Sequence, residues 1–357
     1  MSPNISIKMA DSMSLQTALA FSKNAVDIPM SEHCTFDFAR TGNTEPFAML
    51  IVSSEIRKFL RERPNTKVSC VNFGHMHYAA HMGFFRAFGL EHGKKPGEAK
   101  GSSRYIPMRI LDCAALRQEA IGKGLEVGEQ IEKNSEEIAS LLTNGDSSTL
   151  HETLTYSIRE IMRNVLEHSQ SSRLGICAQY WPSKNKVEVA ILDRGIGLRK
   201  SLSPNPHIDT TTDKNAINFS LMPAISGKSF KGSKNKSKGP WANSGFGLYM
   251  TNRICRNGGN FFIGSGNAGL LLTQGNKKWH ECNLDGTAVR MVINTEQLPA
   301  LKESLARYRE DGYEFQKEYQ EIVNIDPSSA SLMLSEDFEP SAWQKVKERI
   351  KRERSKL

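Results

Sequence analysis

Glu160 and Asn164 stand four residues apart, in a stretch whose hydrophobic residues recur at helical spacing. Residues at this separation share one face of a helix, so the carboxylate and the carboxamide are expected side by side. An amide oxygen can ligate Mg²⁺, and a carboxylate can orient or deprotonate a water molecule. The same pair also occurs on ordinary exposed helix faces, so its interpretation depends on the residues that follow.

A second group of chemical interest comes directly after a predicted strand. Residues 174–180 and 186–192 indicate two strands of an antiparallel hairpin, and Asp193, Gly195 and Gly197 follow the second strand. The glycines allow a tight turn and a close approach of the backbone to a flat ligand. The Asp193 carboxylate can accept a hydrogen bond from an exocyclic amine such as that of adenine.

Gly245 and Gly247 precede a predicted helix over residues 248–256. Glycines at the start of a helix leave backbone N–H groups free, and these groups bind phosphate together with the helix dipole. The preceding segment, residues 226–238, is rich in Gly, Ser and Lys. It is typical of an exposed loop, and it could also close over a triphosphate, with lysines such as Lys228 screening the charge.

Thr287 enters a predicted strand over residues 285–293, where its hydroxyl could reach a ligand. His168 follows the Glu160–Asn164 segment, and a position near phosphates and a packing role are both compatible with it. The order of the four motifs is therefore ExxxN on a helix, DxGxG after a strand, GxG at a helix start, and Gly-Thr on a strand.

This order resembles the GHKL ATPase superfamily, the histidine-kinase-like ATPases, over residues 117–296. Asn164-Val-Leu-Glu-His168-Ser and Gly245-Phe-Gly-Leu-Tyr-Met are nearest to the anti-sigma serine kinase and histidine-kinase branches. The resemblance implies a Bergerat-fold α/β sandwich that binds ATP and Mg²⁺ between the loops at the sheet end and a lid.

The resemblance also implies roles for individual residues. Glu160 corresponds to the general base, Asn164 to the Mg²⁺ ligand, and Asp193 to the residue that recognises adenine in a pocket shaped by Gly195 and Gly197. The other implied ATP-binding residues are Lys228 of the lid, the phosphate-binding segment Gly245, Phe246, Gly247 and Leu248, and Thr287 beside the base and its bound water.

Residues 31–116 indicate a separate small α/β domain, preceded by a loose leader over residues 1–30 that contains one short helix. Strands are predicted at residues 35–38 and at 68–73, the latter buried. Helices are expected at residues 46–60 and 78–88, and a closing strand at residues 105–111. The pattern resembles the STAS domain of anti-sigma-factor antagonists, although His75 and its neighbours occupy the place of that family's phosphoacceptor hydroxyl.

His75, His77 and His81 have a spacing that could converge on Zn²⁺ if a helix begins between them. No acidic residue or cysteine lies near them in the sequence. Roles in turns or in packing are therefore the favoured interpretation for these histidines.

The whole chain of 357 residues has 38% hydrophobic and 24% charged residues, which is typical of a soluble globular protein. It shows no apolar run of membrane-spanning length and no secretory signal, and its six cysteines are scattered, so a cytoplasmic location is expected. The net charge of +8 is concentrated partly in the Lys-rich loop of residues 228–238 and partly in the tail of residues 345–356. This tail belongs to a helical C-terminal extension expected over residues 297–357.

The expected function is Mg²⁺-dependent hydrolysis of the γ-phosphate of ATP by a signalling ATPase or nucleotide-controlled regulatory module. Two alternatives remain open at this point. One is a serine/threonine protein kinase of the anti-sigma type, and the other is a non-catalytic interaction protein stabilised by ATP. A protein partner or a homodimer is expected, whereas nucleic acid is not the favoured partner and a membrane is not expected.

Overall fold

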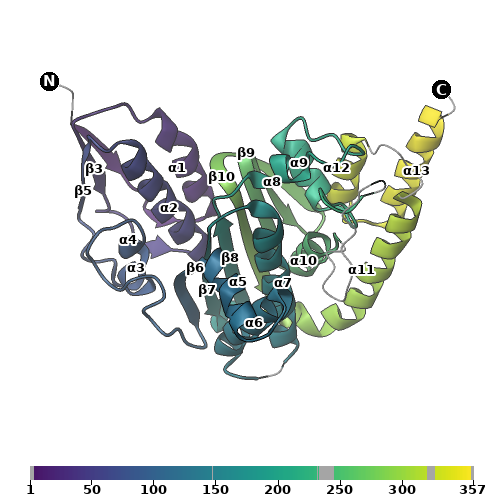
Figure 1. Ribbon diagram of the computed structural model, residues 1–357, viewed down its shortest axis with the longest axis horizontal. Coiled ribbons are helices and arrows are strands. Elements are labelled where there is room, and N and C mark those ends of the chain that lie inside the picture. The colour runs from purple at the N-terminus through teal and green to yellow at the C-terminus, as the bar shows by residue number, and fades with distance from the viewer. Residues whose placement is uncertain (1–3, 147, 231, 233–244, 320–325, 355–357) are drawn as a thin grey trace.

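The computed structural model describes residues 4–146, 148–230, 232, 245–319 and 326–354. It is a mixed α/β protein, as predicted, with a three-stranded parallel sheet and a five-stranded antiparallel sheet on opposite sides of helices α1 (Leu15–Asn24) and α2 (Pro46–Glu62) (Figure 1). A further group of helices covers the free face of the antiparallel sheet. The layers thus run from a small sheet, through two helices and a large sheet, to an outer helical layer.

The parallel sheet has the order β1-β3-β5, formed by β1 (Ile5–Lys8), β3 (His33–Asp37) and β5 (Lys67–Val71). Parallel strands need crossover connections, which α1 and α2 provide. The short helix expected within residues 1–30 is α1, but the prediction of a loose leader was wrong, because β1 in this segment is a strand of the parallel sheet. Its helical signal is the buried set that recurs every three or four residues along α1, namely Leu15, Ala18, Leu19 and Ser22.

Other N-terminal predictions hold with adjustments. The strand expected at residues 68–73 is β5, but it lies at a sheet edge with alternate residues exposed, so the prediction of a buried strand was wrong. The helix expected at residues 78–88 is divided into α3 (His77–Met82) and α4 (Phe84–Ala87) by Gly83, whose φ is 92°. The shortest elements are β2 (Ser12–Met13), β4 (Asn43–Thr44) and a 3₁₀ turn, Ala25–Asp27.

The antiparallel sheet has the order β6-β7-β8-β10-β9. The hairpin of β7 (Arg173–Trp181) and β8 (Lys186–Asp193) is confirmed, with a 3₁₀ turn at Pro182–Lys184. The strand expected to close the N-terminal sheet is β6 (Tyr105–Asp112), which pairs instead with β7, so Asp112 faces Arg173. The last two strands, β9 (Asn260–Thr273) and β10 (Asn276–Asn294), form a long second hairpin.

Helices cover one face of this sheet and share a hydrophobic core with it. The chain after β6 forms two helices, α5 and α6, with a break between them at the left-handed Gly124. This layer consists of α5 (Cys113–Gly122), α6 (Val127–Thr143), α7 (Thr149–Asn164), α8 (Gly197–Leu202), α9 (Asp213–Ser220) and α10 (Gly247–Arg256).

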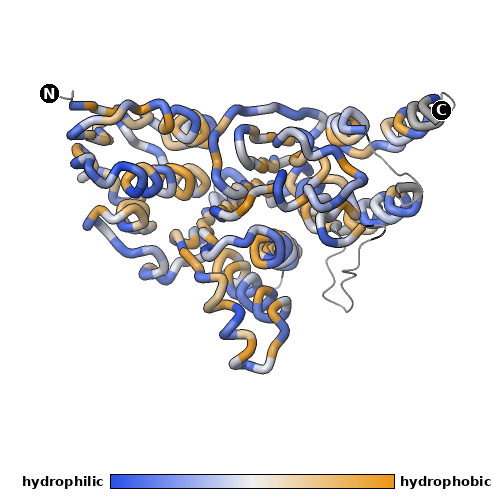
Figure 2. The backbone as a smooth tube through the Cα atoms, turned by 45° about the horizontal axis from the view of Figure 1, so that its top comes forward, coloured by the Kyte–Doolittle hydropathy of each residue, from blue (hydrophilic) through white to orange (hydrophobic). Residues whose placement is uncertain are grey.

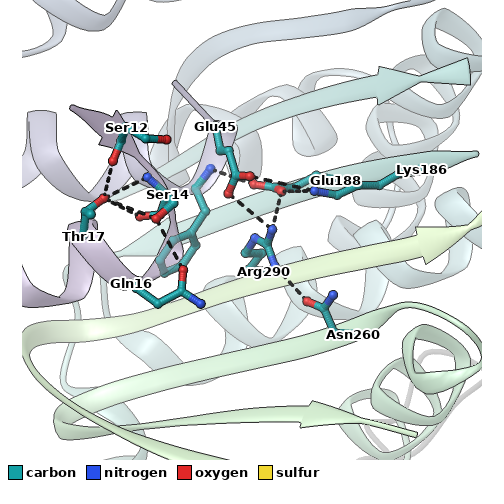
Figure 3. A network of polar contacts seen from close by, with 10 residues as sticks. Ser12, Ser14, Gln16, Thr17, Glu45, Lys186, Glu188, Asn260 and Arg290 are labelled. Atoms are coloured by element: carbon teal, nitrogen blue, oxygen red, sulfur yellow. Dashed lines mark hydrogen bonds and ion pairs between the residues drawn. The ribbon is translucent and has the colours of Figure 1, made fainter. Parts of the chain in front are cut away.

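The opposite face of the same sheet packs against the N-terminal helices. The ring of Phe47 on α2 meets that of Phe262 on β9, with centroids 5.3 Å apart. Beside them, the fully buried carboxylate of Glu188 pairs with Arg290 at 2.7 Å and accepts the Phe47 N–H at 3.2 Å. Figure 3 shows this polar network, in which Glu45 also points toward Arg290. The N-terminal region and the large sheet therefore form one continuous body.

The C-terminal extension is helical, as predicted, with α11 (Leu298–Tyr319), α12 (Pro327–Ser335) and α13 (Pro340–Arg354) after a 3₁₀ turn at Thr295–Gln297. It packs on α10, where the guanidinium of Arg253 lies 3.9 Å from the centroid of the Tyr308 ring and pairs with Asp311 at 2.8 Å. Within the described ranges no helix is long and apolar enough to cross a bilayer, and Figure 2 shows hydrophobic and hydrophilic residues in short alternation.

Candidate functional site

A cavity of about 820 Å³, counting its open mouth, lies between the end of α7, the end of β8 and the start of α10. Seven of the residues predicted from the sequence line it, although they come from four separate segments of the chain. They are Asn164, Asp193, Gly197, Gly245, Gly247, Leu248 and Thr287.

Asp193 is the most buried charged residue among these, with only 2% of its surface exposed. Its Oδ1 accepts the N–H of Gly195 at 2.7 Å, and the backbone N–H of Thr287 on the adjacent β10 also donates to this carboxylate. Burial raises the pKa of Asp193 to about 6, and the two backbone hydrogen bonds oppose that rise. A buried carboxylate with remaining acceptor capacity faces the cavity.

The two glycines after Asp193 are required by close packing. A Cβ at Gly195 would overlap the carbonyl oxygen of Ser169, at the end of the α7 segment. Gly197 has a φ of 71°, and a Cβ there would lie 2.8 Å from the Ser265 hydroxyl. Gly195 itself does not line the cavity, so its contribution is to bring the Asp193 turn against the end of the helix.

The end of α7 widens into a π-helical turn, Val165–Ser169, directly after Asn164. Such turns are rare and frequently occur at functional sites. Val165, His168 and Ser169 of this turn line the cavity beside Asn164. Burial, with Lys228 and Arg163 nearby, lowers the pKa of His168 to about 4, so its imidazole is neutral at physiological pH.

Glu160 lies one helical turn before Asn164, but it is not among the residues that line the cavity. Its Oε1 pairs with the Arg159 guanidinium at 3.0 Å, and Arg159 also pairs with Glu132 at 3.0 Å. The other carboxylate oxygen packs against the backbone of Gly247, where a Cβ would overlap it. The carboxylate of Glu160, the predicted base, is thus packed against the first turn of α10 and does not line the cavity.

Two further predicted residues have their side chains outside the cavity lining. The ring of Phe246 is buried against Tyr249 and Tyr313, so it anchors the start of α10 to α11. The Nζ of Lys228 donates to the carbonyl oxygen of Glu167 in the π-helical turn. Ser226 and Gly227, just before Lys228, do line the cavity. Residues 231 and 233–238 of the predicted lid lie outside the described residues.

Sequence reasoning missed Ser265, whose side chain connects two turns that border the cavity. Its hydroxyl accepts the N–H of Leu198 at 3.0 Å and donates to the carbonyl oxygen of Gly286 at 2.7 Å. It thereby ties the Gly197 turn to the residue before Thr287. Nothing local marks a single serine within a strand, so only the pairing of β9 with β10 reveals its position.

The histidines of the N-terminal region do not converge. The Nε2 of His75 bonds to the carbonyl oxygen of Thr41 at 2.8 Å, while the Nε2 of His81 bonds to the Tyr105 hydroxyl at 2.7 Å. Among the residues with described placement, no group of three His, Cys, Asp or Glu side chains is arranged to hold a metal ion. The observed contacts fit the packing roles that the sequence favoured.

The cavity therefore combines a buried acceptor, apolar walls and a glycine-rich helix start. Its walls include Ile161, Ile191, Ile225, Ile263 and Val289. This arrangement can hold a flat apolar group beside the carboxylate and an anionic group beside the glycines. No protein-family model, curated protein or solved structure matches this chain.

Proposed function

We propose that this cavity binds ATP with Mg²⁺, and that the protein is an ATPase or nucleotide-controlled module of the GHKL type. The observation that carries the proposal is the position of Asp193. Its buried carboxylate lies in an apolar cavity, between the glycine turn of residues 195–197 and the strand that begins near Thr287. An exocyclic amine is the natural donor to such a group.

The phosphate end of the ligand would lie toward α10. Gly245 has a φ of 72°, and a Cβ there would be 2.9 Å from backbone atoms of residues 224 and 225. This position therefore requires glycine, both for its backbone conformation and for the close contact. Gly247 begins a helix of ten residues, whose N-terminal N–H groups favour an anion. Asn164 borders the same space and supplies an amide oxygen of the kind that ligates Mg²⁺.

Hydrolysis would need Glu160 to act on a water molecule, and the ion pair with Arg159 restrains it. This contact supports a regulated enzyme in which Glu160 is released when the α10 segment moves. The same contact favours a second candidate, a switch that binds ATP without rapid turnover. In either case the chain would report its nucleotide state through α10 and the C-terminal helices that pack on it.

The N-terminal region supports a regulatory assignment as well. Its alternating order β1-α1-β3-α2-β5 builds a parallel sheet, the arrangement expected for the STAS-like domain that we propose there. Because α2 packs directly on β7 and β8, a protein bound to this region would act on the strand that carries Asp193.

The test is binding and turnover of ATP labelled on the γ-phosphate, with the full chain and Mg²⁺. Asp193→Asn should weaken ATP binding about a hundredfold, whereas the exposed control Asp27→Asn should bind normally. Asn164→Ala should remove the dependence of affinity on Mg²⁺. Normal ATP binding by Asp193→Asn would overturn the assignment of the cavity.

The fate of the label separates the remaining alternatives. Free phosphate indicates an ATPase, label on a partner protein indicates a kinase, and label on neither indicates a non-catalytic switch. Arg159→Gln is informative here, because it frees Glu160 from its ion pair without changing the cavity lining. Faster release of phosphate by this variant is the result expected of a restrained ATPase.

A further inference from the structure

A second cleft lies where α2 crosses the end of the large sheet. It encloses about 1240 Å³, counting its open mouth. Cationic side chains from three elements surround it. They are Arg57, Lys58 and Arg61 on α2, Arg173 at the start of β7, and Arg194 directly after β8.

Part of this positive charge is neutralised within the protein. Lys58 pairs with Asp285 at 2.7 Å, and Arg194 pairs with the buried Glu55 at 2.6 Å. In contrast, Arg61 and Arg173 make no side-chain hydrogen bond or ion pair with any residue that the structure describes. Like charges gathered around one cleft repel each other, and a bound anion would relieve that repulsion.

Arg57 adds a third cation without a carboxylate partner in the described parts of the chain. Its guanidinium donates to a backbone carbonyl, that of Ala87, at 3.1 Å. Arg57 and Arg61 are four residues apart on α2, so they present two guanidinium groups from one helix face. Arg173 approaches the same cleft from the sheet. Three guanidinium groups thus converge on one space.

The floor of the cleft is different in character. Leu50, Met108 and Leu192 line it as almost fully buried apolar side chains, and Ile110 has 38% of its surface exposed. Ser54 and Ser171 also line the cleft; the Ser54 hydroxyl accepts the Nε–H of Arg194, and the Ser171 hydroxyl donates to the carbonyl oxygen of Arg173. The cleft therefore offers a cationic rim for an anionic group and an apolar floor for a flat body.

We propose that this cleft binds a phosphorylated small molecule of the nucleoside phosphate class. Guanidinium groups bind phosphate oxygens in pairs, and the apolar floor can take a base. Asp285 also lines the cleft, but its carboxylate is paired with Lys58. A nucleic acid strand is the less favoured occupant, because Glu62 lies beside Lys58 outside the cleft lining and would repel a phosphate backbone that continued past the cleft. This site is separate from the ATP cavity and does not depend on that assignment.

The test uses the full chain with two probes, inorganic pyrophosphate and fluorescent N-methylanthraniloyl-GDP. Because Arg61 and Arg173 have no side-chain partners among the described residues, Arg61→Gln with Arg173→Gln should fold normally, which thermal melting verifies. The double variant should bind both probes at least about tenfold more weakly. Arg104→Gln is the matched control, since Arg104 is exposed and precedes β6 at the end away from Arg173.

Measurements in an Asp193→Asn background keep the two sites apart. Probe binding that survives Asp193→Asn and falls with the arginine pair supports the cleft, whether or not ATP binds elsewhere. Probe binding that falls only with Asp193→Asn, or no binding of either probe, overturns the proposal. A single-stranded oligonucleotide that binds more tightly than both probes, through the same arginines, would also overturn it in favour of nucleic acid.

Discussion

At the scale of single residues, Asp193 stands out because its carboxylate is buried and has no cationic hydrogen-bond partner among the residues that the structure describes. Two backbone N–H groups, from Gly195 and Thr287, are its contacts. Amide groups orient the carboxylate but compensate only part of its lost hydration. A group in this position costs stability when it is ionised, which is a common property of residues retained for binding.

This cost gives a prediction about pH. Burial raises the pKa of Asp193 in the folded state to about 6, well above the ordinary value of an aspartate, so the folded state holds the proton more tightly than the unfolded chain does. The resulting stability is present below about pH 4 and is lost as pH rises through about 6, a change of roughly 3 kcal/mol in the free energy of unfolding. Asp193→Asn lacks this titration. Urea unfolding of both proteins from about pH 4 to 8 should therefore diverge, and parallel curves would contradict the burial argument.

A second prediction concerns Gly195. A Cβ there would overlap the backbone carbonyl of Ser169, which cannot swing away as a flexible side chain could. Gly195→Ala should therefore reduce the free energy of unfolding by about 2 kcal/mol or more. Gly122→Ala is the control, because nothing lies within 4 Å of its Cβ position and its φ is not left-handed. The comparison is made by urea unfolding, with a neutral or slightly stabilised control expected.

At the scale of elements, the sequence predicted what local pattern determines. The helical spacing around Ile158 and Ile161, and the hairpin before Asp193, need no knowledge of distant segments. The partner of β6 could not be read in this way, because strand pairing depends on neighbours far along the chain. The strand β9 was missed because both of its faces are covered and glycines such as Gly264 and Gly269 interrupt its pattern.

The same distinction applies to the site. Motif residues on turns, such as Gly197 and Gly245, were identified because their backbone conformations need glycine. The positions of the side chains of other motif residues could not be predicted in the same way. Phe246 belongs to a motif but packs on Tyr313 of α11. Glu160 pairs with Arg159 of its own helix, and Arg159 in turn pairs with Glu132 of α6. Sequence spacing places a residue on a face but does not determine what that face meets.

The junction between α2 and the large sheet gives a prediction at this scale. Arg290 lies between Glu188, which is fully buried, and Glu45. Arg290→Met leaves Lys186, whose Nζ lies 3.5 Å from a Glu188 oxygen, as the remaining cation beside this buried carboxylate. The substitution should lower the free energy of unfolding by about 3 kcal/mol, the lower end of the cost of breaking a buried pair. Arg40→Met removes an exposed pair with Asp11 and should cost less than about 1 kcal/mol.

Urea unfolding measures both effects. Adding Glu188→Gln to Arg290→Met should restore part of the loss, because the unpaired charge is then removed. An equal cost for the two arginine substitutions would show that the buried network does not hold the N-terminal helices on the sheet.

At the scale of the whole molecule, the proposed ATP cavity and the basic cleft lie at the end of one strand. Asp193 is the last residue of β8 and faces the cavity, while Arg194, the next residue, lines the cleft. The guanidinium of Arg194 is held by Ser54 and Glu55 of α2, so the N-terminal helix layer contacts the turn that shapes the cavity. A conformational change that breaks this contact would therefore alter both the proposed ATP cavity and the basic cleft.

Two anionic ligands at these neighbouring positions should oppose each other. We expect saturating pyrophosphate to weaken ATP binding about three- to tenfold, because negative charge accumulates on both sides of the Asp193–Arg194 turn. Linkage requires ATP to weaken pyrophosphate binding by the same factor, which titration calorimetry in both orders can measure. Arg194→Lys keeps the charge but lacks the planar guanidinium that donates to Ser54 and Glu55 at the same time. This substitution should therefore reduce the coupling between ATP binding and pyrophosphate binding. Equal ATP affinities with and without pyrophosphate, in a protein shown to bind both, would mean that the two sites act independently.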